Sequence, residues 1–339
     1  MSLSGIQIFK LLPGGKKAPE ANCKKCNFPT CMAYAMKLAK GEALIEQCCY
    51  ISDELKDLIE SQSGKKQETI TFGINQKQIK TGGETVLYRH DKTFLNPTCI
   101  SIKLTTSKGF EYFNNTIQQI KNYKVERIGE EISIQCISIQ NDNNDSDMFI
   151  KFISKLVQEN LDACFSLILV SFELDDLIKG YNLLVDSQKP ILFLKNANKG
   201  DYTRLYQSTC STICIEADTI DDLATLSEKL EAEKVKDLIL AIPDNCKDNI
   251  IETLTLIRRS VVINNIKALR FPILTDASEY ILTQNDIQQG IWAGCLLSKY
   301  SNIVLINFFN PAIVYSLFTL RQNLFTDPQK PLQIEPNLY

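Results

Sequence analysis

From about residue 99 onward, short apolar runs alternate with amphipathic stretches. Eight strand-like runs are predicted, at 99–104, 132–139, 166–171, 191–194, 213–216, 238–242, 273–274 and 303–306. Most are followed by stretches with helical periodicity, for example 110–123, 148–161, 174–185, 220–232, 247–264 and 285–299. Eight β-then-α units over roughly 240 residues match a (β/α)8 barrel. The alternative is a doubly wound sheet, which commonly has fewer strands. The pattern therefore predicts an α/β chain whose TIM barrel spans 94–323.

The first sixty residues have a different pattern. Residues 4–12 and 32–40 predict two short helices, the second with Thr30 as its N-cap and Gly41 after its end. Ser52 is expected to cap a third helix over 53–59. Three short helices bury little apolar surface, so a bound metal is expected to supply much of the stability of this small helical domain, residues 1–60.

A polar stretch at 61–68 is expected to link the small domain to the barrel. The runs 71–73 and 85–88, separated by Gly82 and Gly83, predict a β-hairpin within the segment 61–93. Residues 324–339 are then left as a C-terminal tail. The predicted order is cluster domain, linker with hairpin, barrel and tail.

Bulk properties narrow the class of protein. The 339 residues are 44% hydrophobic and 23% charged, which is typical of a globular protein. The net charge of −3 shows no basic excess, so we expect no nucleic-acid partner. No apolar run is long enough to span a membrane, and the first residues are too short and interrupted for a signal peptide. We therefore expect a cytoplasmic protein with no membrane partner.

The twelve cysteines are unevenly spread, since five of them lie between Cys23 and Cys49. The other seven are scattered and are expected to be buried, unreactive thiols: Cys99, Cys136, Cys164, Cys210, Cys214, Cys246 and Cys295. The single histidine, His90, excludes histidine-based triads and metal sites with several histidines.

Four thiols form the spacing C-x2-C-x4-C-x16-C: Cys23, Cys26, Cys31 and Cys48. A zinc ribbon usually pairs two tight C-x2-C knuckles, and the second is absent. Three close ligands and one distant ligand suit a cubane, whose irons lie at separated corners. The spacing favours a [4Fe–4S] cluster over zinc and over unligated thiols.

The surroundings of the motif favour an anionic group. Cys31 is predicted in the first turn of a helix, where free N–H groups and the helix dipole stabilise negative charge. Lys24 and Lys25 add positive charge nearby, although they are equally compatible with a solvated surface. One face of this helix, formed by Met32, Ala35, Met36 and Ala39, is expected to shield the cluster from water.

The barrel shows no catalytic signature in the sequence. It has no phosphate loop, no nucleophile elbow and no paired acid and base, so we assign no catalytic residue. Polar residues expected at the strand ends are Asn196, Asp244, Asn245 and Asp276. They are candidates for a binding mouth, but such residues are also common helix caps.

Four stretches of the chain together point to one family. They are GIQIFKLLP (5–13), the cysteine motif with NFPTCMAYAMKLA (27–39), GGETVLYRH (82–90) and RQNLFTDPQKP (321–331). Through them the chain resembles, from end to end, the large (gamma) subunit of the corrinoid iron–sulfur protein, part of the acetyl-CoA decarbonylase/synthase (CO dehydrogenase/acetyl-CoA synthase) system.

The resemblance implies a methyl carrier rather than an enzyme with its own catalytic residues. In such proteins a corrinoid cobalt takes a methyl group from a methyl-tetrahydropterin and passes it to acetyl-CoA synthase, and the [4Fe–4S] cluster reduces the cobalt when it is oxidised. Implied partners are the small (delta) subunit, a methyl-tetrahydropterin methyltransferase and acetyl-CoA synthase. Carried over to this sequence, the cluster ligands are Cys23, Cys26, Cys31 and Cys48.

Two departures from the family pattern leave alternatives open. Cys49 stands where the family usually has proline, so the fourth ligand is either Cys48 or Cys49. The sequence reaches 335–339 about where the family's cobamide domain would begin, so we expect either a fragment or a corrinoid bound elsewhere, and assign no cobamide ligand. A free-standing [4Fe–4S] electron-transfer protein and a barrel methyltransferase or binding module remain alternative functions.

Overall fold

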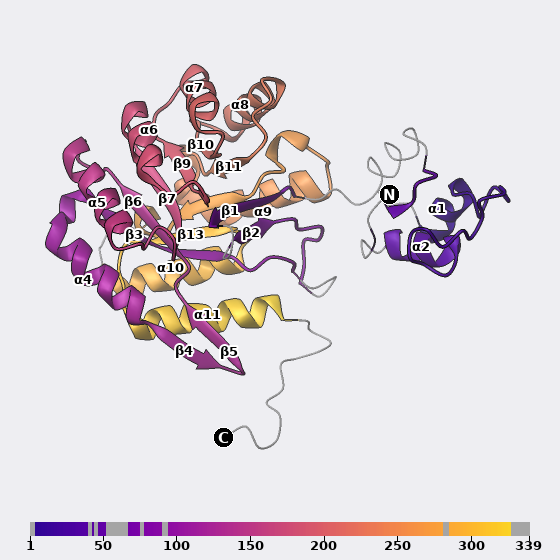
Figure 1. Ribbon diagram of the computed structural model, residues 1–339, viewed down its shortest axis with the longest axis horizontal. Helices are drawn as coiled ribbons and strands as arrows, with labels where there is room; N and C mark the ends of the chain where they lie inside the picture. Colours follow the sequence, from indigo (N-terminus) through magenta and orange to yellow (C-terminus); the bar gives the residue numbers. More distant parts are fainter. Residues whose placement is uncertain are drawn as a thin grey trace. The chain divides into compact units, whose positions relative to one another are not determined.

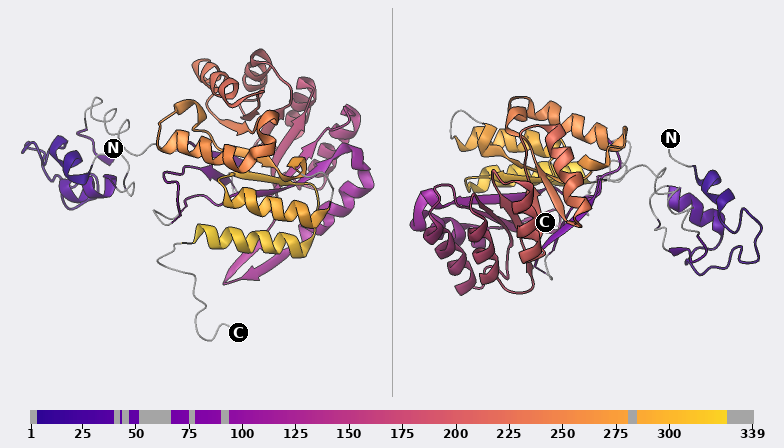
Figure 2. Two further views of the ribbon diagram at one scale, coloured as in Figure 1. Left: turned by 180° about the vertical axis from the view of Figure 1, so that it is seen from behind. Right: turned by 90° about the horizontal axis from the view of Figure 1, so that it is seen from above.

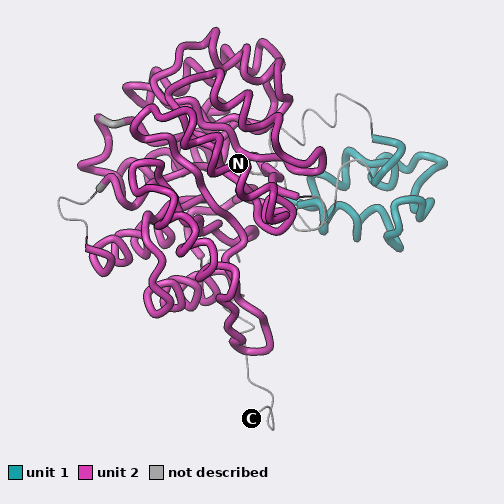
Figure 3. Tube along the Cα trace, turned by 60° about the vertical axis from the view of Figure 1, so that its left-hand side comes forward, with its two compact units in different colours: residues 1–66 teal, residues 67–339 magenta. Residues whose placement is uncertain are grey.

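The structure, a computed structural model, describes residues 4–39, 43, 47–51, 67–74, 78–89, 94–280 and 285–326. The chain divides into two compact units, Met1–Lys66 and Gln67–Tyr339 (Figure 3). Each unit has its own hydrophobic core, so each is treated by itself. None of the helices within the described ranges is long and apolar enough to cross a membrane.

The small unit is built on two packed helices, α1 (Gly5–Leu11) and α2 (Cys31–Ala39). Ser4 caps α1 in a capping box with Gln7, which fixes where the helix begins. Both helices were predicted, and both are confirmed. Ile8 and Leu12 from the first helix and its C-cap pack into one small core with the second helix. The predicted helix at 53–59 and Gly41 lie outside the described residues.

The buried face of α2 differs from the predicted one. Cys31, Tyr34, Ala35 and Leu38 are buried, which is the i, i+3, i+4, i+7 pattern of one helix face. Met32 and Met36 are 36% and 45% exposed, and Ala39 is exposed as well. The expected shielding face of Met32, Ala35, Met36 and Ala39 was therefore wrong for all but Ala35, because α1 packs against the stripe that contains Cys31.

The large unit is a closed barrel of eight parallel strands with helices outside it (Figures 1 and 2). The strands follow one another around the barrel in chain order, as expected for a TIM barrel rather than a doubly wound sheet. They are β3 (Cys99–Thr105), β6 (Cys136–Gln140), β7 (Ser166–Ser171), β9 (Ile191–Leu194), β10 (Thr212–Ile215), β11 (Leu238–Ala241), β12 (Ile273–Asp276) and β13 (Ile303–Ile306).

Helices return the chain from each strand to the next. They are α4 (Gly109–Asn122), α5 (Ser146–Gln158), α6 (Leu174–Leu183), α7 (Lys199–Thr209), α8 (Ile220–Ala232), α9 (Ile250–Val262), α10 (Asp286–Ser298) and α11 (Pro311–Phe325). Short 3-10 turns lie at η2 (Thr106–Lys108), η3 (Asp244–Asn249), η4 (Lys267–Leu269) and η5 (Ala277–Tyr280). The main core fills the layer between strands and helices, and a second core fills the barrel interior.

The predicted strand at 132–139 is two elements. Its first part belongs to β5 (Glu130–Ser133), which pairs with β4 (Lys124–Arg127) in an antiparallel ribbon, and the rest begins β6. Arg127 pairs with Glu130, so the loop is Ile128 and Gly129, both with positive φ. That is the geometry of a type I′ hairpin, which diverts the chain before the barrel strand starts.

The hairpin before the barrel pairs different residues from those predicted. Strand β1 (Thr69–Ile74) pairs with β2 (Ile79–Gly82), whereas 85–88 is not a strand. Gly82 and Gly83, with φ of 81° and 83°, end the second strand instead of turning the hairpin. Strand β1 also pairs with β8 (Gln188–Lys189), and its apolar side chains join the barrel-interior core. The hairpin therefore closes the N-terminal end of the barrel.

Two of the family-like stretches meet at the end of the last helix. The Arg89 guanidinium donates from Nε and Nη2 to the carbonyl oxygens of Leu324 and Thr326, each at 3.0 Å. The rings of Phe94 and Phe325 pack with their centroids 5.8 Å apart. Arg89 thus satisfies carbonyls that a helix end leaves unpaired. His90 and residues 327–339 lie outside the described residues.

Candidate metal centre and barrel mouth

The four predicted ligands line one cavity in the small unit. Cys31 and Cys48 are buried, with 8% and 9% exposed, Cys26 is half-buried and Cys23 is exposed. Cys49 is exposed and is not among the residues that line the cavity. Folding thus brings Cys48 to the other three thiols across sixteen intervening residues.

The loop before α2 brings a backbone N–H group to a thiol. Asn22, Lys24 and Asn27 have left-handed φ of 56°, 62° and 64°. Left-handed residues between right-handed ones turn neighbouring N–H groups to the same side, which makes the anion-binding nests found at many Fe–S sites. The Asn22 N–H donates to the Cys31 sulfur at 3.3 Å, and the Cys31 N–H donates to the Asn22 side-chain oxygen at 2.8 Å.

Cys31 is held at the first residue of α2. The predicted cap is present, since the Thr30 hydroxyl accepts the Ala33 N–H at 3.1 Å. Gly14 packs directly on this cysteine, because a Cβ at Gly14 would lie 2.6 Å from the Cys31 Cβ. The helix start and the close glycine together fix the position of the thiol.

The segment around Cys48 approaches the same cavity from the other side. Burial raises the pKa of the Cys48 thiol above its ordinary value. Tyr50 also lines the cavity, and its hydroxyl accepts a hydrogen bond from the Lys25 ammonium at 2.8 Å. Lys24 lines the cavity as well. Positive charge therefore lies next to the thiols, as expected for an anionic group.

The donor set fits an iron–sulfur cluster. Thiolates are the usual ligands of such clusters, and the surrounding N–H donors and lysines favour the anionic forms of thiol and sulfide. In the described part of the chain, no three or more His, Cys, Asp or Glu side chains gather closely enough to hold a single metal ion. All four thiols line the same cavity.

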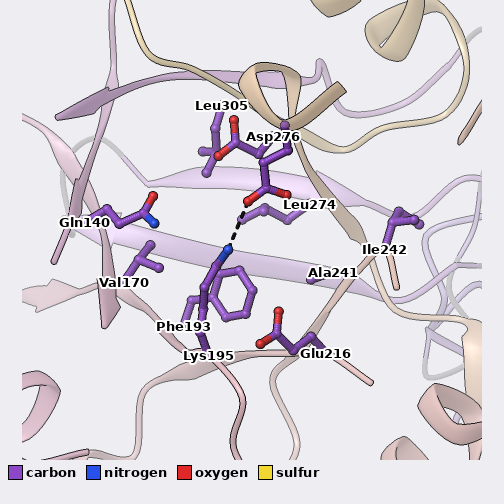
Figure 4. Close-up of a pocket in the computed structure, with 11 residues that line it drawn as sticks. Gln140, Val170, Phe193, Lys195, Glu216, Ala241, Ile242, Leu274, Asp276 and Leu305 are labelled. Carbon is purple, nitrogen blue, oxygen red and sulfur yellow. Dashed lines mark hydrogen bonds and ion pairs between the residues drawn. The ribbon is translucent and has the colours of Figure 1, made fainter. Parts of the chain in front are cut away.

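A second cavity lies at the C-terminal ends of the barrel strands (Figure 4). Its apolar wall includes Phe193, and its polar lining residues are Gln140, Lys195, Glu216, Asp276 and Glu279. These residues come from or just after strands β6, β9, β10 and β12 and from η5. The barrel mouth is where ligands bind in this fold.

Of the polar residues expected at this mouth, Asp276 lines the cavity. The Asn245 side chain instead donates to the Asp218 carbonyl at 3.0 Å, and the Asn196 N–H donates to a Glu216 carboxylate oxygen at 2.5 Å. The Asp244 side chain lies outside the described part. Lys195 and Glu216 were not among the predicted mouth residues, although they directly follow strands β9 and β10.

Ion pairs organise the mouth. Buried Lys103 contacts Asp276 and donates to the Ser278 hydroxyl at 2.6 Å. Glu279 accepts from Lys195 at 2.9 Å and from Lys247 at 2.7 Å. Burial opposes ionisation of Glu279, but the two lysines outweigh it and lower its pKa to about 2. Burial likewise opposes the charge on Lys195, yet Glu279 raises its pKa overall, so the amine stays protonated.

The scattered cysteines differ from expectation. Cys99, Cys136 and Cys214 are buried, and burial raises the pKa of the latter two thiols well above the ordinary value. Four others are not buried, because they lie in loops or on outer helix surfaces: Cys164, Cys210, Cys246 and Cys295. The prediction of seven buried thiols was therefore wrong for these four.

A family model described as CO dehydrogenase/acetyl-CoA synthase delta subunit matches residues 69–339. The chain belongs to this family. A second model, for an Fe–S cluster, matches residues 19–50, which include all four proposed ligands. The small unit is therefore an iron–sulfur domain, and the large unit is the family's barrel.

Curated relatives match nearly the whole chain. The gamma subunit of the acetyl-CoA decarbonylase/synthase complex of Methanocaldococcus jannaschii is 30% identical, over 99% of this chain and 72% of the relative. That of Methanothermobacter thermautotrophicus is 28% identical, over 100% and 74%. The corrinoid/iron-sulfur protein large subunit of Moorella thermoacetica is 29% identical, over 100% and 73%. The resemblance drawn from the sequence is confirmed.

Among solved structures, dihydropteroate synthase from Xanthomonas albilineans has a similar fold. The TM-score is 0.50 at 8% sequence identity, with 74% of this chain and 97% of that chain covered. At this identity the likeness shows the fold alone, and it agrees with the closed eight-stranded barrel.

Proposed function

We propose that the small unit holds a [4Fe–4S] cluster through Cys23, Cys26, Cys31 and Cys48. The observation that carries the proposal is that these four thiols, separated by up to sixteen residues, line one cavity. Four thiols on one cavity match the number of ligands that a cubane needs, since each of its four irons takes one thiolate. The N–H donors of the loop and of the α2 start would stabilise the charge on the ligands.

Cys48 is the fourth ligand in this proposal. It is 9% exposed and lines the cavity, whereas the neighbouring Cys49 is exposed and does not. The comparison of Cys48→Ser with Cys49→Ser tests the choice with a matched pair. We expect low-temperature EPR of the reduced protein to lose the cluster signal in the first variant and keep it in the second. The reverse result would assign the ligand to Cys49.

The protein as a whole is proposed to be a subunit of a corrinoid iron–sulfur methyl carrier. Its partners would be the small (delta) subunit, a methyltransferase that uses methyl-tetrahydropterin, and acetyl-CoA synthase. The names of relatives that match nearly the whole chain support this role. The cluster would supply single electrons that return the corrinoid cobalt to its methyl-accepting state. We assign no corrinoid contact to the described residues.

The role of this chain's own residues is to hold and insulate the electron carrier. Phe28 and Tyr34 line the cavity, with their ring centroids 5.5 Å apart, and limit access of water. Co-purification of this chain with the small subunit in a 1:1 complex is expected. Electron transfer to unrelated redox partners without any association with that subunit would instead support a free-standing electron carrier.

A further inference from the structure

The four proposed ligands differ in how far they are buried. Cys31 and Cys48 are buried, Cys26 is half-buried, and Cys23 is exposed. All four line one cavity, so a cluster bound there comes nearest to solvent at its Cys23 ligand. Electron transfer between proteins slows steeply with the distance between their redox centres. Within the described part of the chain, the surface around Cys23 is therefore the most direct route for an electron into the cluster.

Lysine and tyrosine side chains surround this exposed ligand. Lys24 is exposed and lines the cavity beside Cys23. The Lys25 ammonium group, also on the surface, donates to the Tyr50 hydroxyl at 2.8 Å and lies 5.1 Å from the centroid of that ring. Tyr50 is 39% exposed and lines the same cavity. We call the surface formed by Cys23, Lys24, Lys25 and Tyr50 the Cys23 face.

The charge of the chain is divided unevenly between its two units. Residues 1–66 have ten lysines and seven acidic residues, a net charge of +3, whereas the whole chain has a net charge of −3. Residues 4–39, which carry three of the four ligands, have six lysines and a single acidic residue, Glu20. Four thiolates on an oxidised cubane are together anionic, so the edge of the cluster alone would repel carboxylates. The lysines of the Cys23 face reverse this and attract them.

The size of the Cys23 face favours a brief contact with a protein. A nucleic acid binds along an extended basic strip, whereas here two adjacent lysines lie next to a tyrosine ring and an exposed ligand. A contact held by exposed ion pairs is weak and sensitive to salt, and redox encounters between proteins use such small interfaces.

We propose that the Cys23 face docks a small acidic electron-transfer protein that reduces the cluster. Carboxylates around the redox centre of that protein pair with Lys24 and Lys25, and its apolar rim packs on Tyr50. One electron passes from the partner's reduced low-potential centre to the oxidised cluster, and no bond or proton is exchanged. This docking rests on the proposed [4Fe–4S] centre, because without the cluster the small unit has no electron acceptor.

The test uses the full chain, with its cluster loaded under anaerobic conditions, and an acidic plant-type [2Fe–2S] ferredoxin as the probe. NMR titration of the ¹⁵N-labelled ferredoxin, with both proteins oxidised, measures binding without any contribution from the potential of the cluster. Binding should be saturable at about 20 mM salt and at least about tenfold weaker at about 300 mM, because salt screens exposed charges.

Variants place the docking on the Cys23 face. Lys24→Gln/Lys25→Gln should bind the ferredoxin about three- to tenfold more weakly at low salt, as for the loss of two exposed ion pairs. Lys10→Gln/Lys37→Gln is the matched control, since it removes the same charge from the last turns of α1 and α2, outside the cavity lining. It should change binding less than about twofold.

Stopped-flow reduction supplies a second readout. The variant of the Cys23 face should accept electrons more slowly from reduced ferredoxin, but not from the methyl viologen radical cation, which is not attracted by lysines.

The proposal is overturned if the ferredoxin does not bind at low salt, if salt leaves its binding unchanged, or if both double variants lose the same affinity. Tighter binding of a single-stranded oligonucleotide than of the ferredoxin would also contradict it. Iron and sulfide content, measured on the same samples, tests the cluster separately.

Discussion

The two partners of the buried ion pair at the barrel mouth should differ in how much stability the protein loses when each is replaced. Lys103 and Asp276 side chains are 7% and 8% exposed, so neither charge is well solvated. Asp276→Asn keeps the shape of the side chain but leaves the Lys103 ammonium group with neutral acceptors alone, among them the Ser278 hydroxyl. Removing one partner of a buried pair costs about 3–5 kcal/mol of the free energy of unfolding.

Replacing Lys103 instead of Asp276 should lower the free energy of unfolding by a smaller amount. After Lys103→Met, the Asp276 carboxylate still accepts from the Ser278 N–H at 3.0 Å and the Ser278 hydroxyl at 2.6 Å. The loss should then be about 1.5–3 kcal/mol, as for one hydrogen bond to a charged group. The double variant carries no buried charge at these positions, so it should be more stable than Asp276→Asn alone.

Urea unfolding of the full chain, followed by far-UV circular dichroism, measures these free energies. The slope of the free energy of unfolding against urea concentration should be the same in all the variants. Shifts of the urea midpoint then report differences in stability. The reasoning would be refuted if Lys103→Met cost more than Asp276→Asn, or if both cost less than about 1 kcal/mol, the level of an exposed pair.

Three further outcomes are expected. Glu279 has a pKa of about 2 in the folded state against an ordinary 4.5. Its contribution to stability is therefore present above pH 4.5 and is lost as the pH falls towards 2. In unfolding experiments at a series of pH values, Glu279→Gln should lose less of its free energy of unfolding as the pH falls than the unchanged protein does. Gly14→Ala should lower iron content, because the new Cβ crowds Cys31, whereas Gly294→Ala, whose added Cβ meets ordinary contacts, should not. In the large unit, native-state thiol labelling with peptide mass spectrometry should modify the exposed Cys164, Cys210 and Cys295. It should spare the buried Cys99, Cys136 and Cys214.

The barrel could be predicted because its strands are buried on both faces and read as continuous apolar runs. The runs at 166–171, 191–194 and 303–306 coincide with observed strands. Helix α7 (Lys199–Thr209) was not among the predicted helices, since its sequence is largely polar. Helix α11 was not named as an amphipathic stretch either, because apolar residues occur around much of its circumference.

The two hairpins were not predicted correctly, for a different reason. Glycine pairs mark positive φ but do not say whether the chain turns or merely ends a strand. Gly82 and Gly83 predict a turn between two strands, but in the structure they end β2. Ile128, a β-branched residue with φ of 53°, gives no turn signal of its own, so the β4–β5 ribbon was not predicted.

The spacing of the four cysteines predicts the cluster site, because the ligands of an iron–sulfur cluster are thiolates even where the loop that carries them is irregular. Spacing did not reveal which face of α2 is buried, since that depends on where α1 packs. At the barrel mouth, Lys103 lies inside a strand that is buried throughout. Its role was hidden because its partner, Asp276, is 173 residues away in the sequence and meets it only when the barrel closes.

The measurement that tests the central claim most directly is the metal and sulfide content of the anaerobically purified full chain. Four thiols on one cavity predict about four irons and four acid-labile sulfides per chain. One zinc ion per chain without sulfide would contradict the proposed [4Fe–4S] centre.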